Sequence, residues 1–251
     1  MSTSTAIEQV ADGVLRIHRA ATNCYLLHGD DGLTLVDAGL PRMWPLLVQA
    51  LRTLGAAPDD LSAVVLTHGH FDHVGLCDRL RARHGVASHI HAADAALARH
   101  PYRYAHQAPR WPYPVLYPAA VPILTGMVLA GALRVAGTVA HGDVVPGAAL
   151  DVPGSPVPVW SPGHTNGHCG FHLPGPGILF TGDALVTRDP YTGLSGPRLV
   201  AKAATADIEA NIVSLGNLRE TGADLVLPGH GPAFRGGIRR AVDEAIRNRA
   251  R

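Results

Sequence analysis

The sequence has few cysteines, few aromatic side chains and no excess of either charge. Its 251 residues include three cysteines, Cys24, Cys77 and Cys169. These are too few and too unevenly spaced for a disulfide framework, so we expect a reducing compartment and a cytoplasmic protein. The N-terminal Met1–Glu8 has no basic stretch followed by an apolar core, which predicts that a signal peptide is absent.

The charge balance also excludes some partners. The net charge is +1, and the basic residues are scattered along the chain apart from an arginine-rich C-terminal helix. Nucleic-acid-binding proteins gather such residues into a patch, so we expect no nucleic acid partner and instead a small-molecule substrate. Aromatic residues make up only 5% of the chain, so aliphatic side chains must build the interior.

One short segment is unusually rich in metal-binding side chains. Between Thr67 and Val74 it holds His68, His70, Asp72 and His73. Imidazole and carboxylate are the ligands that zinc and related cations accept. The apolar run at 63–66 reads as a buried strand that delivers the first two histidines, and we expect a helix at 72–84 to open with the other two residues. A polar turn with chance histidines is the less favoured alternative.

Three later strand ends carry further candidate ligands. Apolar runs at 157–160, 177–180 and 223–227 lead into Gly163-His164, Gly182-Asp183 and Gly229-His230. Glycine lets the backbone turn sharply and approach a site closely. Each of these motifs taken singly is more often a simple turn, but together with the first cluster they favour a metal site.

This series of motifs resembles the metallo-β-lactamase-fold hydrolases, over nearly the whole chain except about 101–140. Thr67–His73 fits the family's His-x-His-x-Asp-His element, and Leu35–Gly39 fits its earlier acidic strand end. The resemblance implies an α/β fold, a four-layer αββα sandwich. It also implies a division of the ligands: His68, His70 and His164 on one metal, Asp72, His73 and His230 on the other, and Asp183 bridging both.

The same resemblance indicates the reaction. The bridging carboxylate is present in glyoxalase II and the metallo-lactonases but lacking in true β-lactamases. We therefore expect two zinc ions, although iron and manganese accept the same ligands. A shared hydroxide, oriented by Asp72, would attack the carbonyl of an ester, lactone or thioester. The alternatives are a mononuclear iron persulfide dioxygenase of the same fold, a β-lactamase-like amide hydrolase and a non-catalytic metal-bound scaffold.

Other residues are candidates for supporting roles. Asp37 is expected to accept a hydrogen bond from a ligand histidine and fix its tautomer, with a surface turn as the alternative. In the Gly- and Pro-rich loop at 184–198, Tyr191 could donate to the substrate carbonyl, as a tyrosine does in related lactonases, and Arg188 or Arg198 could meet a carboxylate. A structural loop with surface arginines explains this segment equally well. His168 could contact substrate or form a local hydrogen bond.

Residues 1–251 are expected to form one domain with an apolar, proline-rich insertion at about 101–140. Within it, Trp111–Leu133 carries no charge. About 20 residues suffice for a membrane-spanning helix. Prolines at 112, 114, 118 and 122 break the first half, however, leaving about three helical turns from Ile123, so we expect no stable membrane insertion. A cap over the site is favoured. Core packing, a homodimer contact and attachment to a membrane surface remain alternatives.

Overall fold

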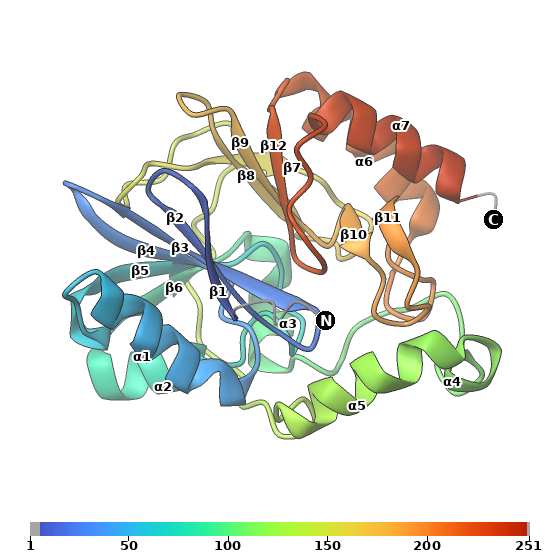
Figure 1. The fold of residues 1–251 in the computed structure, drawn as a ribbon, viewed down its shortest axis with the longest axis horizontal. Helices are drawn as coiled ribbons and strands as arrows, with labels where there is room; N and C mark the ends of the chain where they lie inside the picture. Colours follow the sequence, from blue (N-terminus) through green and yellow to red (C-terminus); the bar gives the residue numbers. More distant parts are fainter. Residues whose placement is uncertain (1–5, 250–251) are drawn as a thin grey trace.

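The first half of the chain forms a six-stranded sheet. The computed structural model describes residues 6–249, and its first sheet runs in sequence order (Figure 1). Strands β1 to β4 are antiparallel neighbours, whereas β4, β5 and β6 are parallel. These strands are β1 (Ile7–Ala11), β2 (Val14–Arg19), β3 (Thr22–Gly29), β4 (Gly32–Val36), β5 (Leu61–Val65) and β6 (Ala87–His89).

The second half contributes a four-stranded sheet in the order β12-β9-β8-β7. Its strands are β7 (Val157–Trp160), β8 (Cys169–Leu173), β9 (Ile178–Gly182) and β12 (Leu225–Pro228). Strands β9 and β12 are parallel, so their carboxyl ends meet at the same edge. A separate antiparallel pair, β10 (Val186–Arg188) and β11 (Ser195–Arg198), follows the end of β9.

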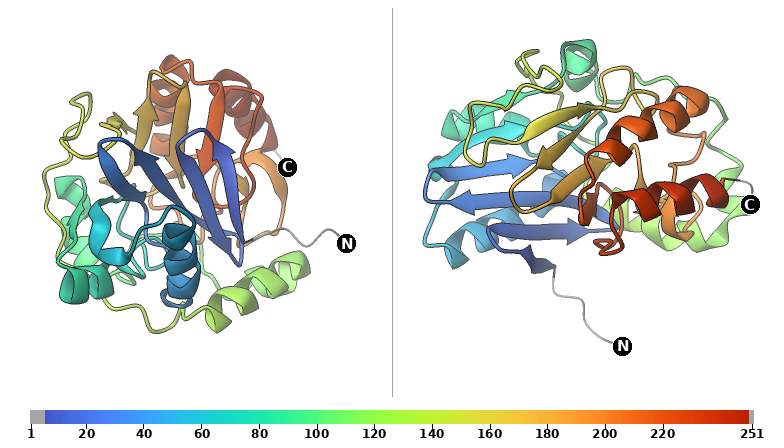
Figure 2. Two further views of the ribbon diagram at one scale, coloured as in Figure 1. Left: turned by 60° about the vertical axis from the view of Figure 1, so that its left-hand side comes forward. Right: turned by 90° about the horizontal axis from the view of Figure 1, so that it is seen from above.

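Helices cover the outer faces of the two sheets, and this confirms the expected four-layer αββα sandwich (Figures 1 and 2). Helices α1 (Trp44–Thr53) and α2 (Cys77–His84) lie on the first sheet, and α6 (Ile208–Glu220) and α7 (Ile238–Asn248) lie on the second. Between the sheets, Phe171 and Phe180 are fully buried with aliphatic neighbours. Shorter helices are α3 (Ala95–Arg99), α4 (Tyr113–Leu116) and α5 (Val121–Leu129), with 3-10 turns at Pro41–Met43, Pro58–Asp60, Ala92–Asp94 and Pro118–Ala120.

The helix expected at 72–84 begins only at Cys77, so the expectation that Asp72 and His73 open a helix is wrong. The reason is that the backbone here bonds to another loop rather than to its own next turn. The carbonyl of His73 accepts from the amide of Ala38, and the amide of Gly75 donates to the carbonyl of Gly39. These bonds consume groups that a helix would need, so the two ligand candidates lie in a turn.

Residues 101–140 form an irregular segment around α4 and α5, drawn in green in Figure 1. Helix α5 packs Ile123 and Met127 against the core cluster of the first sheet. Other apolar side chains face outward, among them Trp111 and Leu129, which are 79% and 59% exposed. Helix α5 begins at Val121, slightly earlier than expected, because Pro122 falls in the first turn, where its missing N–H costs little. No helix among residues 6–249 has the length and hydropathy needed to cross a membrane.

Candidate metal centre

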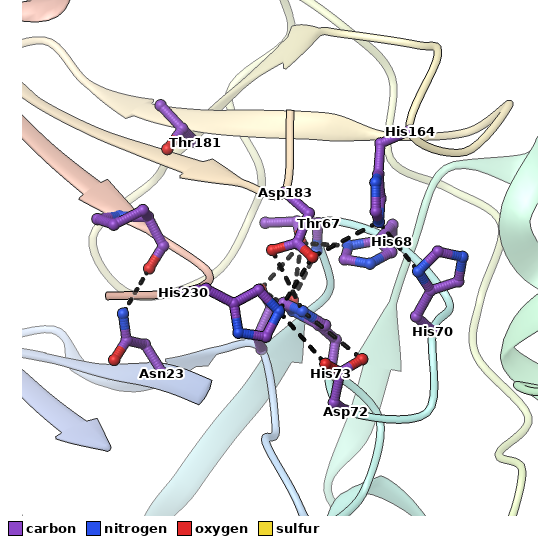
Figure 3. A network of polar contacts seen from close by, with 12 residues as sticks. Asn23, Thr67, His68, His70, Asp72, His73, His164, Thr181, Asp183 and His230 are labelled. Carbon is purple, nitrogen blue, oxygen red and sulfur yellow. Dashed lines mark hydrogen bonds and ion pairs between the residues drawn. The ribbon is translucent and has the colours of Figure 1, made fainter. Parts of the chain in front are cut away.

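The seven candidate ligands lie together where the two sheets meet (Figure 3). The segment after β5 carries His68, His70, Asp72 and His73. The other three residues follow the ends of three strands of the second sheet: His164 after β7, Asp183 after β9 and His230 after β12. All seven are at most 5% exposed. Residues more than 160 positions apart in the sequence thus share one small volume.

Three groups of donor atoms lie close enough together to hold a cation. They are His68 with His70 and His164, Asp72 with His73 and His230, and His68 with His73 and Asp183, and within each group the donor atoms lie within 4.8 Å of one another. Asp183 lies centrally: its carboxylate oxygens are 3.5 Å from Nε2 of His73, 3.5 Å from Nε2 of His164 and 3.1 Å from Nε2 of His230. We call the His68, His70 and His164 group and the Asp72, His73 and His230 group the two halves of the cluster. The carboxylate of Asp183 faces donors of both halves.

Several of the donor atoms have no hydrogen-bond partner within residues 6–249. The Nε2 atoms of His68, His70 and His73 and the Oδ1 atom of Asp183 are buried and form no hydrogen bond within residues 6–249. An unpartnered buried polar atom costs about 1–3 kcal/mol. A bound cation would satisfy such atoms at once, and imidazole nitrogens with carboxylate oxygens are what zinc, iron or manganese accept. The residues present therefore fit a metal centre.

Asp37 orients two of the histidines through their Nδ1 atoms, directly for His73 and through Thr67 for His68. Its Oδ2 atom lies 2.9 Å from Nδ1 of His73. The hydroxyl of Thr67 donates to the same carboxylate at 2.9 Å, so it is free to accept from Nδ1 of His68 at 3.0 Å. Each imidazole can thus donate through Nδ1, which directs its Nε2 toward the cluster. Asp37 is 3% exposed and holds this position at a left-handed φ of 56°, so the surface-turn alternative does not apply.

The Nδ1 atoms of two further candidate ligands also have partners. Nδ1 of His230 lies 3.2 Å from the carbonyl of Ala21, and Nδ1 of His164 lies 3.4 Å from the hydroxyl of Thr205. His168 has a different task, because its Nε2 accepts from the backbone amide of Asp183 at 3.0 Å. Its Nδ1 lies 2.8 Å from the hydroxyl of Ser161. Of the two roles considered for His168, the structure supports the local hydrogen bond.

The two halves of the cluster differ in their protonation. Burial, with the neighbouring imidazoles, lowers the pKa of His68 and of His70 well below the ordinary value, and burial lowers that of His164 to about 4. Burial also opposes protonation of His73 and His230, but Asp183 and the other carboxylates outweigh it. They raise the pKa of His73 well above the ordinary value and that of His230 to about 10. Without a cation, these two histidines therefore neutralise the buried carboxylates.

Two glycines let the ligands approach. A Cβ atom on Gly229 would lie 2.2 Å from Oδ1 of Asp183 and 2.7 Å from Cε1 of His73. A Cβ atom on Gly182 would lie 2.6 Å from Nε2 of His168. Gly182 belongs to the Gly-Asp motif of the sequence and Gly229 to a Gly-His motif. Glycine is needed at both positions because a side chain would collide with residues of the site.

Asp94 is a buried residue that the sequence did not single out. Its Oδ2 atom accepts from the amide of Gly69 at 3.0 Å and from the hydroxyl of Thr165 at 2.7 Å, and Oδ1 accepts from the amide of Gly167 at 2.7 Å. Gly69 lies between two candidate ligands, and Thr165 follows a third. Asp94 therefore ties the loop of His68 and His70 to the loop of His164.

A cavity of about 230 Å³ opens over the cluster. His70, Asp72, Asp183 and His230 form part of its wall, and most of the rest is apolar, including Phe71, Leu124, Met127, Val128 and Leu133. Residues of the 101–140 segment thus face the candidate ligands directly. Leu129, in contrast, is not among the lining residues.

Two tyrosines and one arginine provide polar groups in this cavity. Tyr191, expected from the sequence, lies with its hydroxyl 3.4 Å from that of Tyr104, which the sequence did not indicate. The ring of Tyr104 packs on His70 with centroids 4.0 Å apart. Burial raises the pKa of both tyrosines, so both hydroxyls stay protonated and can donate.

The arginine of the cavity is Arg110 rather than either of the two arginines expected from the sequence. Arg188 and Arg198 line other hollows of the surface. Arg198 donates to the carbonyls of Ser195 and Gly196 within its own strand. Neither is placed to meet a substrate that occupies the cavity over the cluster.

Comparison with known proteins identifies similar chains. A sequence model described as the metallo-beta-lactamase superfamily matches residues 19–230. The protein YobT of Bacillus subtilis (strain 168) is 30% identical over 167 residues, which are 66% of this chain and 63% of YobT. A hydroxyacylglutathione hydrolase of Fuscovulum blasticum is 32% identical over 164 residues, which are 64% of this chain and 47% of that protein. The chain therefore matches less than two thirds of the length of these two relatives.

A solved structure gives the same fold. A metallo-beta-lactamase family protein from Thermus thermophilus superposes with a TM-score of 0.69, and the match covers 96% of this chain and 81% of that one. The two sequences are 24% identical. This likeness concerns the architecture of the two proteins.

Proposed function

The chain belongs to the metallo-β-lactamase superfamily of metal-dependent hydrolases, and we propose that it uses two metal ions to hydrolyse an ester, lactone or thioester of a small organic acid. The observation that carries this proposal is the convergence of seven buried imidazole and carboxylate side chains, four of whose donor atoms have no hydrogen-bond partner within residues 6–249.

Each side chain has a role in this proposal. His68, His70 and His164 would hold one ion, and Asp72, His73 and His230 the other, with Asp183 between them. When bound, such ions supply Lewis acidity and hydroxide near neutral pH. Asp183 faces donors of both groups at 3.1–3.5 Å, which supports a bridging role. Asp72 lies in the cavity wall, where an unshared carboxylate oxygen would accept a hydrogen bond from the attacking water.

The cavity supports a carbonyl substrate of modest size. Tyr191 retains its proton and lines the space beside the cluster, so we assign it the hydrogen bond to the substrate carbonyl as negative charge develops on that oxygen. Leu124, Met127 and Val128 of the 101–140 segment would exclude water and contact the acyl group. In this proposal the segment is a cap over the site, and the limited volume of the cavity favours a small-molecule substrate.

The test combines metal analysis with a substrate panel. Elemental analysis at pH 8 should find two ions per chain, and a panel of esters, lactones, thioesters, β-lactams and phosphodiesters should show turnover confined to the first three classes. Asp183→Ala should lower metal content and reduce kcat/KM by more than about 100-fold, beyond the loss caused by removing a mere supporting partner. Asp143→Ala, at an exposed carboxylate that pairs with His89 outside the cluster, is the matched control.

Three results would contradict the proposal. Full activity of Asp183→Ala with one ion per chain would exclude the bridging role. Preferred cleavage of β-lactams would favour an amide hydrolase. Persulfide-dependent oxygen uptake by a one-iron form would replace hydrolysis with the dioxygenase reaction.

A further inference from the structure

Arg110 is a cation inside the cavity that lacks a complete set of partners. It precedes α4 and lines the cavity together with the candidate metal ligands. Its Nε atom donates to the carbonyl of Ala203 at 3.2 Å, and its Cζ atom lies 4.3 Å from the ring centroid of Tyr104. Its Nη2 atom is buried and has no hydrogen-bond partner within residues 6–249.

A buried guanidinium N–H without an acceptor is unfavourable, and arginine cannot escape the cost by losing its proton. None of the oxygen atoms in the cavity wall accepts a hydrogen bond from Nη2 within residues 6–249. The Nε contact and the packing on Tyr104 hold the side chain in place at the wall of the cavity, where Nη2 still lacks an acceptor. A planar anion with two oxygens is the group that best satisfies such a fork.

The position of Arg110 shows which part of a ligand it would meet. The ring of Tyr104 packs against both groups: its centroid lies 4.3 Å from Cζ of Arg110 and 4.0 Å from the ring centroid of His70. An anion at Arg110 would therefore lie in the same cavity as the candidate metal ligands. It is a second group of the substrate, joined by a short apolar spacer to the carbonyl that reacts.

We propose that Arg110 binds a free carboxylate of the substrate, which makes the preferred substrate a half-ester, half-thioester or carboxylated lactone of a short dicarboxylic acid. This inference rests on the proposed hydrolase function. One guanidinium matches the single charge of a carboxylate. A cavity of about 230 Å³ is smaller than the ~300–1,000 Å³ of sites for drug-sized ligands, which favours a short acid.

The kinetic test uses two esters that differ only at the far end. The mono-4-nitrophenyl ester of adipic acid has a free carboxylate, and its methyl-capped counterpart has none. The wild-type, metal-loaded protein should favour the free acid in kcat/KM by about 10- to 100-fold, mostly through KM, as expected for a hydrogen-bonded ion pair. The ratio should fall close to one in Arg110→Met. Arg103→Met removes an exposed positive charge that does not line this cavity, and it should keep the wild-type ratio.

A binding measurement separates this inference from the function on which it rests. Calorimetry should show that adipate binds the metal-loaded wild type more tightly than hexanoate, which replaces one carboxylate with a methyl group. That difference should vanish in Arg110→Met. If that variant does not fold, the wild-type comparison of adipate with hexanoate still decides, because equal affinities overturn the proposal.

The two failures look different. Hydrolysis of both esters with equal kcat/KM, with adipate and hexanoate bound equally, would overturn the carboxylate site and leave the hydrolase intact. Tighter binding of adipate that depends on Arg110, with no ester hydrolysis, would support the carboxylate site and overturn the proposed function.

Discussion

Replacement of Asp94 should separate the roles of the two halves of the metal cluster. Its carboxylate is 1% exposed and accepts three hydrogen bonds, from Gly69, Thr165 and Gly167. Asp94→Ala would leave three buried donors without an acceptor, at about 1–3 kcal/mol each. Burial raises the pKa of this carboxyl, so its charge is already costly in the folded state. We therefore expect a loss of about 3–5 kcal/mol, a large part of the ~5–15 kcal/mol typical of a domain.

Asp94→Asn is the more informative variant, because it keeps the shape and one acceptor oxygen. We expect it to fold and to lose about 1–3 kcal/mol. The loops that Asp94 joins carry His68, His70 and His164, whereas His73 and His230 have other supports, in Asp37 and Ala21. The metal affinity of the His68, His70 and His164 group should thus fall about 10- to 100-fold, the usual effect of losing a supporting hydrogen bond. The metal affinity of the group that contains His73 and His230 should stay close to that of the wild type.

The assay is urea unfolding of the metal-free protein together with a chelator competition that resolves two binding steps. Asp78→Ala is the control, because Asp78 forms an exposed pair with Arg81, and such pairs contribute about 0–1 kcal/mol. Equal weakening of both binding steps in Asp94→Asn would refute the idea that Asp94 acts on one half of the cluster. A stability loss with both affinities unchanged would refute its role in positioning ligands.

Two further predictions concern close packing and protons at the same centre. Gly229→Ala should reduce metal content, because its Cβ would displace Asp183 or His73, whereas Gly216→Ala, with open space around its Cβ, should retain full metal content in the same elemental analysis. The pKa of His230 rises from 6.5 to about 10 because Asp183 and other partners outweigh burial. Stability of the metal-free protein from this source is therefore present below about pH 6.5 and is lost as the pH rises toward 10, while metal affinity rises over the same window. Calorimetry at pH 8 in buffers of different ionisation enthalpy should detect proton release on zinc addition, and buffer-independent heats would contradict this reasoning.

The local signals of the sequence located the candidate ligands because all of them follow apolar strands and five of the seven lie beside a glycine. Strands β5, β7, β9 and β12 all follow this pattern. The pattern could not show that the four strand ends meet. No local sequence signal indicates, for example, that Nδ1 of His70 lies 3.0 Å from Nε2 of His164. That expectation depended on the resemblance to a family. The helix expected at 72–84 was wrong at its start, because the hydrogen bonds of that turn go to residues 38 and 39.

The residues that sequence reasoning missed act through partners far along the chain. Asp94 accepts hydrogen bonds from Thr165 and Gly167, which lie 71 and 73 positions further along the sequence. Tyr104 contacts Tyr191, which lies 87 positions further along. Arg110 was missed for the same reason, since its neighbours in the cavity come from several distant segments. A single buried carboxylate or an arginine in a proline-rich segment has no periodicity or motif that marks it.

The protonation of the cluster bears on how many ions a preparation will contain. His68, His70 and His164 have lowered pKa values and are neutral at neutral pH. His73 and His230 have raised pKa values, so a cation in the second group must displace protons that neutralise buried carboxylates. The first group should therefore fill before the second, and acid should widen the gap. A dinuclear enzyme would then contain one ion per chain at pH 6 and two above pH 8. A mononuclear enzyme would still contain one ion per chain above pH 8, so only the higher pH distinguishes the two.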